Sequence, residues 1–250
     1  EILELDPEKR QVRVQPGVIR DELNQYLKPY GLFFGPNTST SNRCMLGGMV
    51  GNNSSGTTSI RYGVTRDKVV SMKVLLSDGS RAEIEALNPS EVRLKSQGSS
   101  LESIIYKNIL KELSDKEIKN IIRKDFPRPE IHRRNIGYAV DALLESDVFT
   151  PGGEPFNLAR LLCGSEGTLA LTTEITLQLD PLPPEEAAMI VPHYHALEVS
   201  LSDVVPVMEH PLYMCEMMDK VILDCTKNNL EHLENRFFVD GDPAALLMLE

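Results

Sequence analysis

The densest group of residues with the chemistry of a binding site lies between positions 46 and 56, LGGMVGNNSSG. Glycines let the backbone reach positive φ angles and let a ligand approach the main chain closely. Successive N–H groups in such a turn can surround an anion, and Asn and Ser side chains add hydrogen-bond donors. The spacing matches neither the GxGxxG fingerprint nor the P-loop, because no Gly-Lys-Ser or Gly-Lys-Thr follows. Alone, the cluster predicts either a phosphate-binding loop or an ordinary glycine-rich turn.

Two further polar glycine segments accompany this cluster. GPNTSTSN at 35–42 directly precedes it, and GSEGT at 164–168 leads into an apolar run typical of a strand. One such segment is common in any chain. Three of them, each at the edge of an expected strand or helix, indicate a large cofactor that is contacted from several sides.

Histidines and basic residues offer weaker candidates. His193 and His195 are two apart, so on a strand they would face the same side, but without a third ligand we interpret them as an exposed pair rather than a metal site. His132, Arg133 and Arg134 form a basic patch that could bind a carboxylate or phosphate, or could be a solvated turn. No metal site is expected.

Four cysteines, Cys44, Cys163, Cys215 and Cys225, lack close C-x-x-C spacing. In a chain of this length without a secretory signal, this pattern favours free thiols over a disulfide framework and argues against zinc.

Charge is divided unevenly along the 250 residues. Residues 1–139 contain 22 Lys or Arg and 17 Asp or Glu, whereas residues 140–250 contain 4 and 20, for a total of −11. An acidic protein does not favour nucleic acid or an anionic membrane. The basic first part is explained either by an anion site or by solvated surface charge. The hydrophobic fraction of 41% is that of a soluble globular protein and excludes collagen-like and disordered classes.

Local patterns place these residues on expected elements. Two β-rich runs flank Asp78-Gly79 and predict a hairpin, and the polar stretch 31–63 is too long for an ordinary connector, which predicts a functional loop. Periodicity further predicts a strand over 11–15, a helix over 18–27 and the hairpin strands 69–76 and 80–85. Helices are expected within 91–124, and the second of them should open with a capping box at Ser114 and end before Pro127. A short helix within 155–164 and a strand over 169–179 follow.

The proline-rich segment 180–184 predicts a stiff linker and a domain boundary. Beyond it we expect a strand over 187–191, a helix over about 195–208, a strand near 212–216, a helix over 217–226 and a strand from 246. Met208, Met214, Met217 and Met218 are expected to fill the core of this second part.

Taken in order, the motifs resemble a known family. VQPG at 14–17, GLFFGP at 31–36, LGGM at 46–49, NSSG at 53–56 and RYG at 61–63 resemble the FAD-binding domain of the flavin-linked 2-hydroxy acid dehydrogenases. That group contains D-lactate dehydrogenases, the glycolate oxidase flavin subunit and D-2-hydroxyglutarate dehydrogenases, and is related in fold to vanillyl-alcohol oxidase. The likeness continues in DKV at 67–69, SDG at 77–79 and CGSEGTL at 163–169, while NIGY at 135–138 and FNLAR at 156–160 are most similar to large members that also carry an iron–sulfur region.

The resemblance implies an α+β fold of the vanillyl-alcohol oxidase type. Residues 1–184 would form an FAD-binding domain that lacks its first subdomain, and residues 185–250 would begin a ferredoxin-like α+β cap for the substrate. In the family a glycine-rich loop precedes this region, and the catalytic histidine and the substrate-binding basic residues come later in the cap. We therefore expect the chain to be an internal piece of a longer enzyme, inactive by itself and without its own catalytic residues.

The resemblance also implies which residues contact FAD. Ala170 stands where the family usually has glycine, and Cys44 lies near the cofactor loops, but a covalent flavin bond is not expected there. The implied cofactor-binding residues are Pro36, Asn37, Thr38, Ser39, Gly47, Gly48, Asn52, Asn53, Ser54, Ser55, Glu166, Gly167, Thr168 and Leu169.

For the parent enzyme, the resemblance implies oxidation of a small D-2-hydroxy acid (D-lactate, glycolate or D-2-hydroxyglutarate type) to the 2-oxo acid by hydride transfer to flavin N5. Electrons would pass to a quinone or an electron-transfer protein rather than NAD, with an iron–sulfur cluster elsewhere in the parent. A cytoplasmic location is expected, with peripheral association at the inner face of the membrane as an option. The alternatives are a flavin-free fragment without activity and an O₂-using flavin oxidase of another branch. The exact substrate, the acceptor and the oligomeric state are not predicted.

Overall fold

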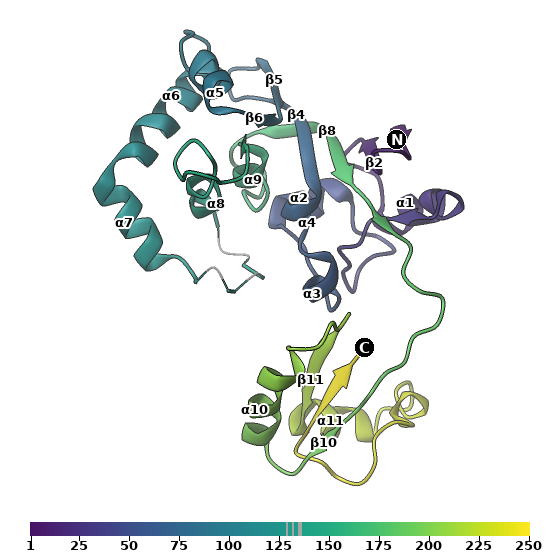
Figure 1. The fold of residues 1–250 in the computed structure, drawn as a ribbon. Coiled ribbons are helices and arrows are strands. Elements are labelled where there is room, and N and C mark those ends of the chain that lie inside the picture. The colour runs from purple at the N-terminus through teal and green to yellow at the C-terminus, as the bar shows by residue number, and fades with distance from the viewer. Residues whose placement is uncertain (129, 132, 135–136) are drawn as a thin grey trace. The chain divides into compact units, whose positions relative to one another are not determined.

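The structure is a computed structural model that describes residues 1–128, 130–131, 133–134 and 137–250. It contains two compact units. Unit 1 comprises residues 1–56 and 63–182, and unit 2 comprises residues 57–62 and 183–250. Figure 1 shows the elements of both units, each of which is described by itself.

Unit 1 is built on a five-stranded antiparallel sheet with the order β1-β2-β8-β4-β5. One face of this sheet packs on the core, because alternate residues such as Val12, Val14, Met72, Ile175 and Leu177 are buried. The strands are β1 (Ile2–Asp6), β2 (Gln11–Val14), β4 (Val69–Leu75), β5 (Arg81–Ile84) and β8 (Leu171–Gln178).

The predicted hairpin is confirmed in β4 and β5. Asp78 Oδ1 accepts hydrogen bonds from the Ser80 N–H at 2.9 Å and the Ser80 hydroxyl at 2.6 Å, and Gly79 has a φ of +82°. Local turn chemistry therefore fixes the register, in which Leu75 pairs with Arg81.

Short elements complete the framework of unit 1. The predicted strand at 11–15 and helix at 18–27 are confirmed as β2 and as α1, which begins two residues later than expected. The further elements are α1 (Arg20–Leu27), a 3₁₀ turn (Lys28–Tyr30), β3 (Leu32–Phe33), α2 (Leu46–Asn52), α4 (Thr65–Lys68), β6 (Ala86–Leu87), α8 (Val140–Leu144), β7 (Phe156–Asn157), α9 (Ala159–Leu162) and β9 (Asp180–Pro181).

Three helices rather than two follow β6: α5 (Pro89–Lys95), α6 (Leu101–Ser114) and α7 (Lys116–Asp125). The predicted capping box at Ser114 is wrong, because α6 continues through that residue. Asp115 is the N-cap of α7 instead, accepting hydrogen bonds from the N–H groups of Glu117 at 2.8 Å and Ile118 at 3.1 Å. The helix ends before Pro127 as expected, since the residue before a proline favours extended backbone.

Unit 2 carries a three-stranded antiparallel sheet with the order β10-β12-β11. Its core includes Tyr194, Leu247 and Leu249. The strand expected from residue 246 is the central one, paired on both sides. The elements are β10 (His193–Tyr194), α10 (Leu197–Val207), β11 (Cys215–Asp219), α11 (Lys220–Lys227), a 3₁₀ turn (Glu234–Arg236) and β12 (Ala245–Leu249), with α3 (Ser59–Tyr62) contributed by the earlier segment.

Three expectations for unit 2 are wrong. The strand predicted at 187–191 is reduced to a single bridge from Ile190 to Leu249. Met217 and Met218 lie in β11 rather than in a helix, because they pair with Leu247 and Leu246. Of the four methionines expected in the core, Met214 is buried, whereas Met208 and Met217 are exposed.

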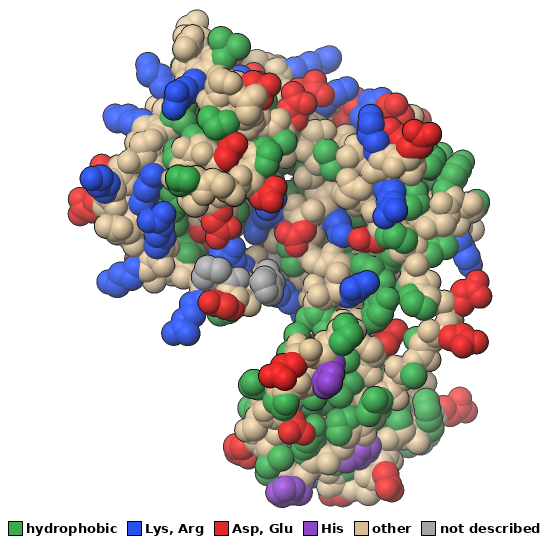
Figure 2. All heavy atoms as spheres, viewed as in Figure 1, with side chains coloured by type: hydrophobic (Ala, Val, Ile, Leu, Met, Phe, Trp, Pro, Cys, Tyr) green, Lys and Arg blue, Asp and Glu red, His purple; other side chains and the backbone are tan. Residues whose placement is uncertain are grey.

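Unit 2 is strongly acidic. Residues 183–250 contain 3 Lys or Arg and 13 Asp or Glu. In unit 1, Lys and Arg side chains gather over α6 and α7 on the face drawn in Figure 2. Much of the basic charge of the first part is therefore solvated helix surface. None of the helices in the described part of the chain is long and apolar enough to cross a membrane.

Candidate flavin site

The glycine cluster at the centre of the sequence analysis is a helix, α2, and not an open loop. Its first turn is held by the chain before α1: the N–H of Gly47 donates to Pro16 O at 2.8 Å, and the N–H of Leu46 donates to Val18 O at 2.9 Å. These two donors are therefore already used within the protein. Tertiary contacts of this kind override the weak helix propensity of glycine.

The glycines of α2 serve different purposes. A Cβ atom on Gly47 would lie 2.6 Å from Pro16 Cβ, so this glycine permits close packing inside the protein. A Cβ atom on Gly48 would meet nothing within 4 Å, so this glycine leaves open space beside the helix. Gly48 therefore leaves the main chain of α2 open to a ligand, whereas Gly47 packs on Pro16 and also lines the cavity described below.

Asn53 ends α2 in the left-handed conformation with a φ of 54° and is fully buried. Its Oδ1 accepts a hydrogen bond from the Arg66 N–H at 2.8 Å, and its Nδ2 donates to Arg134 O at 3.4 Å. The Asn53 side chain thus holds the segment after α2 in place. Asn52 and Ser54, which bond to each other at 2.5 Å, and Ser55 are more accessible.

The turn 164–169 packs directly on α2. The Gly164 N–H donates to Val50 O at 2.9 Å, and the Glu166 N–H donates to Gly51 O at 2.8 Å. Glu166 has a positive φ of 52°, and residues 166–169 are exposed. Ala170 is not among the described non-glycine residues with a positive φ, so its side chain introduces no backbone strain in the turn.

Arg66 connects the end of α2 with the turn 164–169. It is not among the residues predicted from the sequence. Only 9% of the residue is exposed. Its Nε donates to Arg160 O at 2.9 Å and its Nη2 donates to Cys163 O at 2.7 Å. Burial lowers the pKa of the guanidinium and raises the pKa of the Cys163 thiol to about 12. Arg66 stands next to the motif at 67–69, but the backbone oxygens it bonds are 94 and 97 residues away, so no local pattern could reveal it.

The third segment, residues 36–39, meets the end of the glycine cluster 46–56 at Gly56. A Cβ atom on Gly56 would lie 2.5 Å from Asn37 O, so the two backbones pass very close to each other. Pro36 is buried, and its carbonyl accepts a hydrogen bond from Arg20 Nε at 2.7 Å. Thr38 Oγ1 donates to Cys44 Sγ at 3.3 Å, and Ser39 is exposed. All three predicted segments are therefore connected within unit 1.

A cavity of about 230 Å³ lies where α2 meets the turn 164–169. Its walls include three glycines, which leave main-chain atoms accessible, and two hydroxyl residues, Ser165 and Thr172, which add polar groups. At the glycines, no Cβ atom stands between a flat aromatic ring and the main chain. The glycine walls therefore fit a flat portion of FAD. The lining residues are Pro16, Gly47, Val50, Gly51, Leu162, Ser165, Gly167, Ala170, Leu171 and Thr172.

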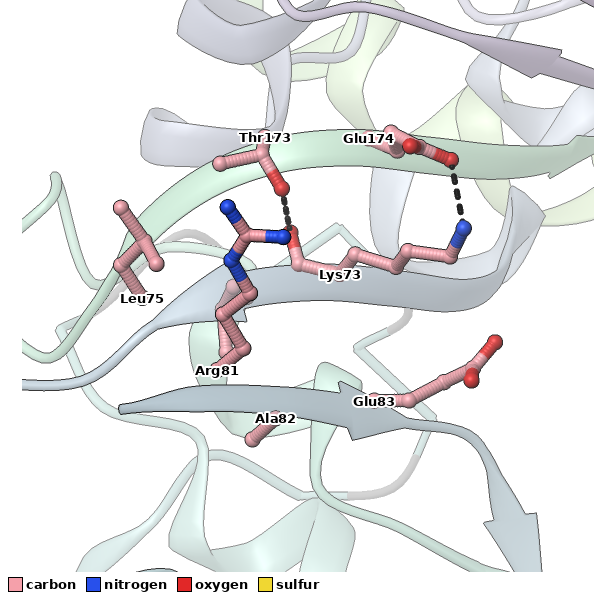
Figure 3. A pocket seen from close by; sticks show the side chains of 8 residues that line it. Lys73, Leu75, Arg81, Ala82, Glu83, Thr173 and Glu174 are labelled. Atoms are coloured by element: carbon pink, nitrogen blue, oxygen red, sulfur yellow. Dashed lines mark hydrogen bonds and ion pairs between the residues drawn. The ribbon is translucent and has the colours of Figure 1, made fainter. Parts of the chain in front are cut away.

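A larger cavity of about 510 Å³ lies elsewhere, on the sheet over β4, β5 and β8 (Figure 3). Lys73 Nζ lies 3.0 Å and Arg13 Nη1 2.6 Å from Glu174 Oε2, and these hydrogen bonds lower the pKa of Glu174. Lys73 and Glu174 are thus paired with each other, and none of the predicted site residues lines this cavity. We do not assign a ligand to it.

Backbone groups engage both ring nitrogens of His193, the first histidine of the pair in unit 2. His193 Nδ1 lies 2.8 Å from Val191 O, and its Nε2 accepts the Asp240 N–H at 3.0 Å, which assigns the proton to Nδ1. No group of three His, Cys, Asp or Glu residues able to hold a metal occurs among the described residues. All four cysteines are free, as predicted. His132, Asn135 and Ile136 lie outside the described residues.

Comparison with known proteins identifies the class of the site. A family model for an FAD binding domain matches residues 1–85. The chain is 34% identical to D-2-hydroxyglutarate dehydrogenase of Pantoea ananatis, and the match covers 92% of this chain and 21% of the relative. It is 27% identical to glycolate oxidase subunit GlcD of Escherichia coli, and that match covers 74% of this chain and 24% of the relative. A solved structure of alkyldihydroxyacetonephosphate synthase superposes with a TM-score of 0.59 at 16% sequence identity, and the match covers the whole of this chain and 36% of the synthase chain. This similarity shows a shared fold.

These matches define a flavoprotein with an FAD-binding domain of α+β fold, as the motifs predicted. The chain belongs to the family of FAD-binding 2-hydroxy acid dehydrogenases. It spans between 21 and 24% of the length of the four D-2-hydroxyglutarate dehydrogenases that it matches.

Proposed function

We propose that the protein oxidises a small D-2-hydroxy acid to the corresponding 2-oxo acid. Bound FAD would supply the hydride acceptor for this oxidation, and the final electron acceptor would be a molecule other than NAD. The observation that carries this proposal is the convergence of the three predicted segments in unit 1, where α2 and the turn 164–169 share a glycine-walled cavity.

The chain's residues divide into two roles under this proposal. Gly48, Ser55 and Thr168 offer open main chain and hydroxyl groups to the cofactor, with Ser39, Asn52, Ser54, Glu166, Gly167 and Leu169 around them. Pro36 and Asn53 act indirectly, because their contacts hold the segments together. Gly47 packs on Pro16 and also lines the cavity. Preorganised donors cost no reorganisation when the ligand binds.

D-2-Hydroxyglutarate is the substrate we favour. Four relatives that are 32 to 34% identical to the chain carry that name, whereas the glycolate oxidase subunit of Escherichia coli and the D-lactate dehydrogenase of Arabidopsis thaliana are 27% and 30% identical. We further propose that residues 1–184 contribute to the FAD-binding domain and that residues 185–250 begin a ferredoxin-like substrate cap. The catalytic base is not assigned to any residue of this chain.

The electron acceptor is proposed as a quinone or an electron-transfer protein, used by an enzyme that is cytoplasmic and peripheral to the membrane. An iron–sulfur cluster outside this chain stays a prediction. Neither point is needed for the flavin site itself.

A steady-state assay of the full-length protein with a dye acceptor tests the proposal. D-2-Hydroxyglutarate should give a higher kcat/KM than D-lactate or glycolate, and the protein should show flavin absorption near about 370 and 450 nm. Flavin bands without activity on any 2-hydroxy acid would refute the substrate class, and turnover with O₂ alone would favour an oxidase. Absence of flavin would refute the site.

A further inference from the structure

We propose that Arg133 and Ser55 form an oxyanion-binding site on the accessible side of the cofactor segments. The proposal deepens the proposed function, because it names residues of the same site and the ligand chemistry they recognise.

Arg133, Arg134, Gly137 and Tyr138 contact both cofactor segments. Arg133 Nε donates to Ser55 Oγ at 3.0 Å, and Tyr138 Oη lies 2.8 Å from Thr168 Oγ1. Between them, Arg134 O accepts the Asn53 amide, and Gly137 O lies 3.3 Å from the position that a Cβ atom on Gly164 would occupy. The four contacts place Arg133 at the rim of the predicted flavin site rather than on remote surface.

The two neighbouring arginines differ in how their charge is balanced. Arg134 forms an ion pair with Asp141, and both side chains are largely buried. Arg133 is exposed, and it takes part in no ion pair within the part of the chain that the structure describes. Its described side-chain partner is the neutral Ser55 hydroxyl, so its positive charge is available to a ligand.

The donor geometry suits an oxyanion. Because Ser55 Oγ accepts from Arg133 Nε, the serine O–H is directed elsewhere and can donate. The two terminal nitrogens of the guanidinium provide further donors in a planar fork that matches carboxylate or phosphate oxygens. Arg133 therefore differs from the basic residues over α6 and α7, which project from helix surfaces (Figure 2).

Two oxyanions are available under the proposed function: the phosphates of FAD and a carboxylate of the substrate. Calorimetric titration of the full-length apoprotein with inorganic pyrophosphate and, separately, with D-2-hydroxyglutarate distinguishes them. Arg133→Gln should weaken binding of one of these probes about tenfold, Ser55→Ala should weaken it severalfold, and Arg133→Lys should recover part of the loss.

Arg128→Gln is the matched control, because it removes an exposed arginine five residues away. Selective loss of pyrophosphate binding assigns the site to the cofactor, and selective loss of D-2-hydroxyglutarate binding assigns it to the substrate. Equal losses in Arg133→Gln and Arg128→Gln, or unchanged binding in Arg133→Gln, overturn the proposal. The titrations do not use flavin, so a protein that lacks flavin bands but keeps the Arg133 effect would refute the proposed function alone.

Discussion

Nη2 of Arg66 donates a 2.7 Å hydrogen bond to the carbonyl oxygen of Cys163, which lies 97 residues later in the chain. The backbone N–H of the same arginine bonds to Asn53 Oδ1 at 2.8 Å. One buried residue thus fixes the end of α2 and the start of the turn 164–169 together. The spacing between α2 and the turn at the predicted flavin site therefore depends on Arg66.

Replacing Arg66 should separate the two segments. Arg66→Met leaves the carbonyl oxygens of Arg160 and Cys163 without their donor, and each unsatisfied buried group costs about 1–3 kcal/mol. We expect the free energy of unfolding in urea to fall by about 2–5 kcal/mol. Arg81→Met on the exposed side of β5 is the control and should change it by less than about 0.5 kcal/mol. Equal effects of the two substitutions would contradict the assigned role of Arg66.

Asn53 combines a buried side chain with a left-handed backbone, and two substitutions separate these contributions. Asn53→Ala loses the hydrogen bond to Arg66 and also strains the positive φ, whereas Asn53→Gly removes only the side chain. Thermal unfolding should therefore rank wild type above Asn53→Gly and Asn53→Gly above Asn53→Ala, with the alanine variant destabilised by about 2–3 kcal/mol. If alanine were tolerated better than glycine, the backbone conformation at this position would not matter.

Cys163 should be inert to alkylation in the folded protein. Its thiol is fully buried, and burial raises its pKa to about 12, so almost no thiolate forms near pH 8. Mass spectrometry after treatment with iodoacetamide should find Cys225, which is exposed, labelled first and Cys163 labelled only after unfolding. Early labelling of Cys163 would show that the turn 164–169 opens readily.

The Glu174 network should make stability depend on acid pH. Hydrogen bonds from Arg13 and Lys73 hold the pKa of Glu174 below its ordinary value of 4.5. A lowered folded pKa stabilises the protein above the unfolded pKa, and this contribution is lost as the pH falls through the folded pKa. The difference in unfolding free energy between wild type and Glu174→Gln should thus be present at pH 7 and shrink below about pH 4.5. A difference independent of pH would exclude the carboxylate as its cause.

Local chemistry allowed part of this fold to be predicted from the sequence. The β4–β5 hairpin follows from the turn at Asp78-Gly79, and the end of α7 follows from Pro127. The family motifs also located the three segments that converge in unit 1.

Non-local contacts explain what could not be predicted. Met217 and Met218 belong to β11 because they pair with β12, and a short apolar run does not by itself distinguish a strand from a helix. The glycine cluster forms α2 because Pro16, Val18 and the turn at 164–169 complete its hydrogen bonds. For the same reason, the sequence could not separate Gly47, which packs on Pro16, from Gly48, which faces open space.

Gly48 provides the most direct test of the central claim that the open main chain of α2 contacts FAD. Gly48→Leu fills open space beside α2 without a predicted clash and replaces a poor helix former, so thermal stability should be kept or rise slightly. Fluorescence titration of the full-length apoprotein with FAD should then show an affinity for FAD that is at least about tenfold weaker. A tenfold change corresponds to the loss of about 1.4 kcal/mol of binding free energy. Unchanged FAD affinity in a folded Gly48→Leu protein would contradict the account.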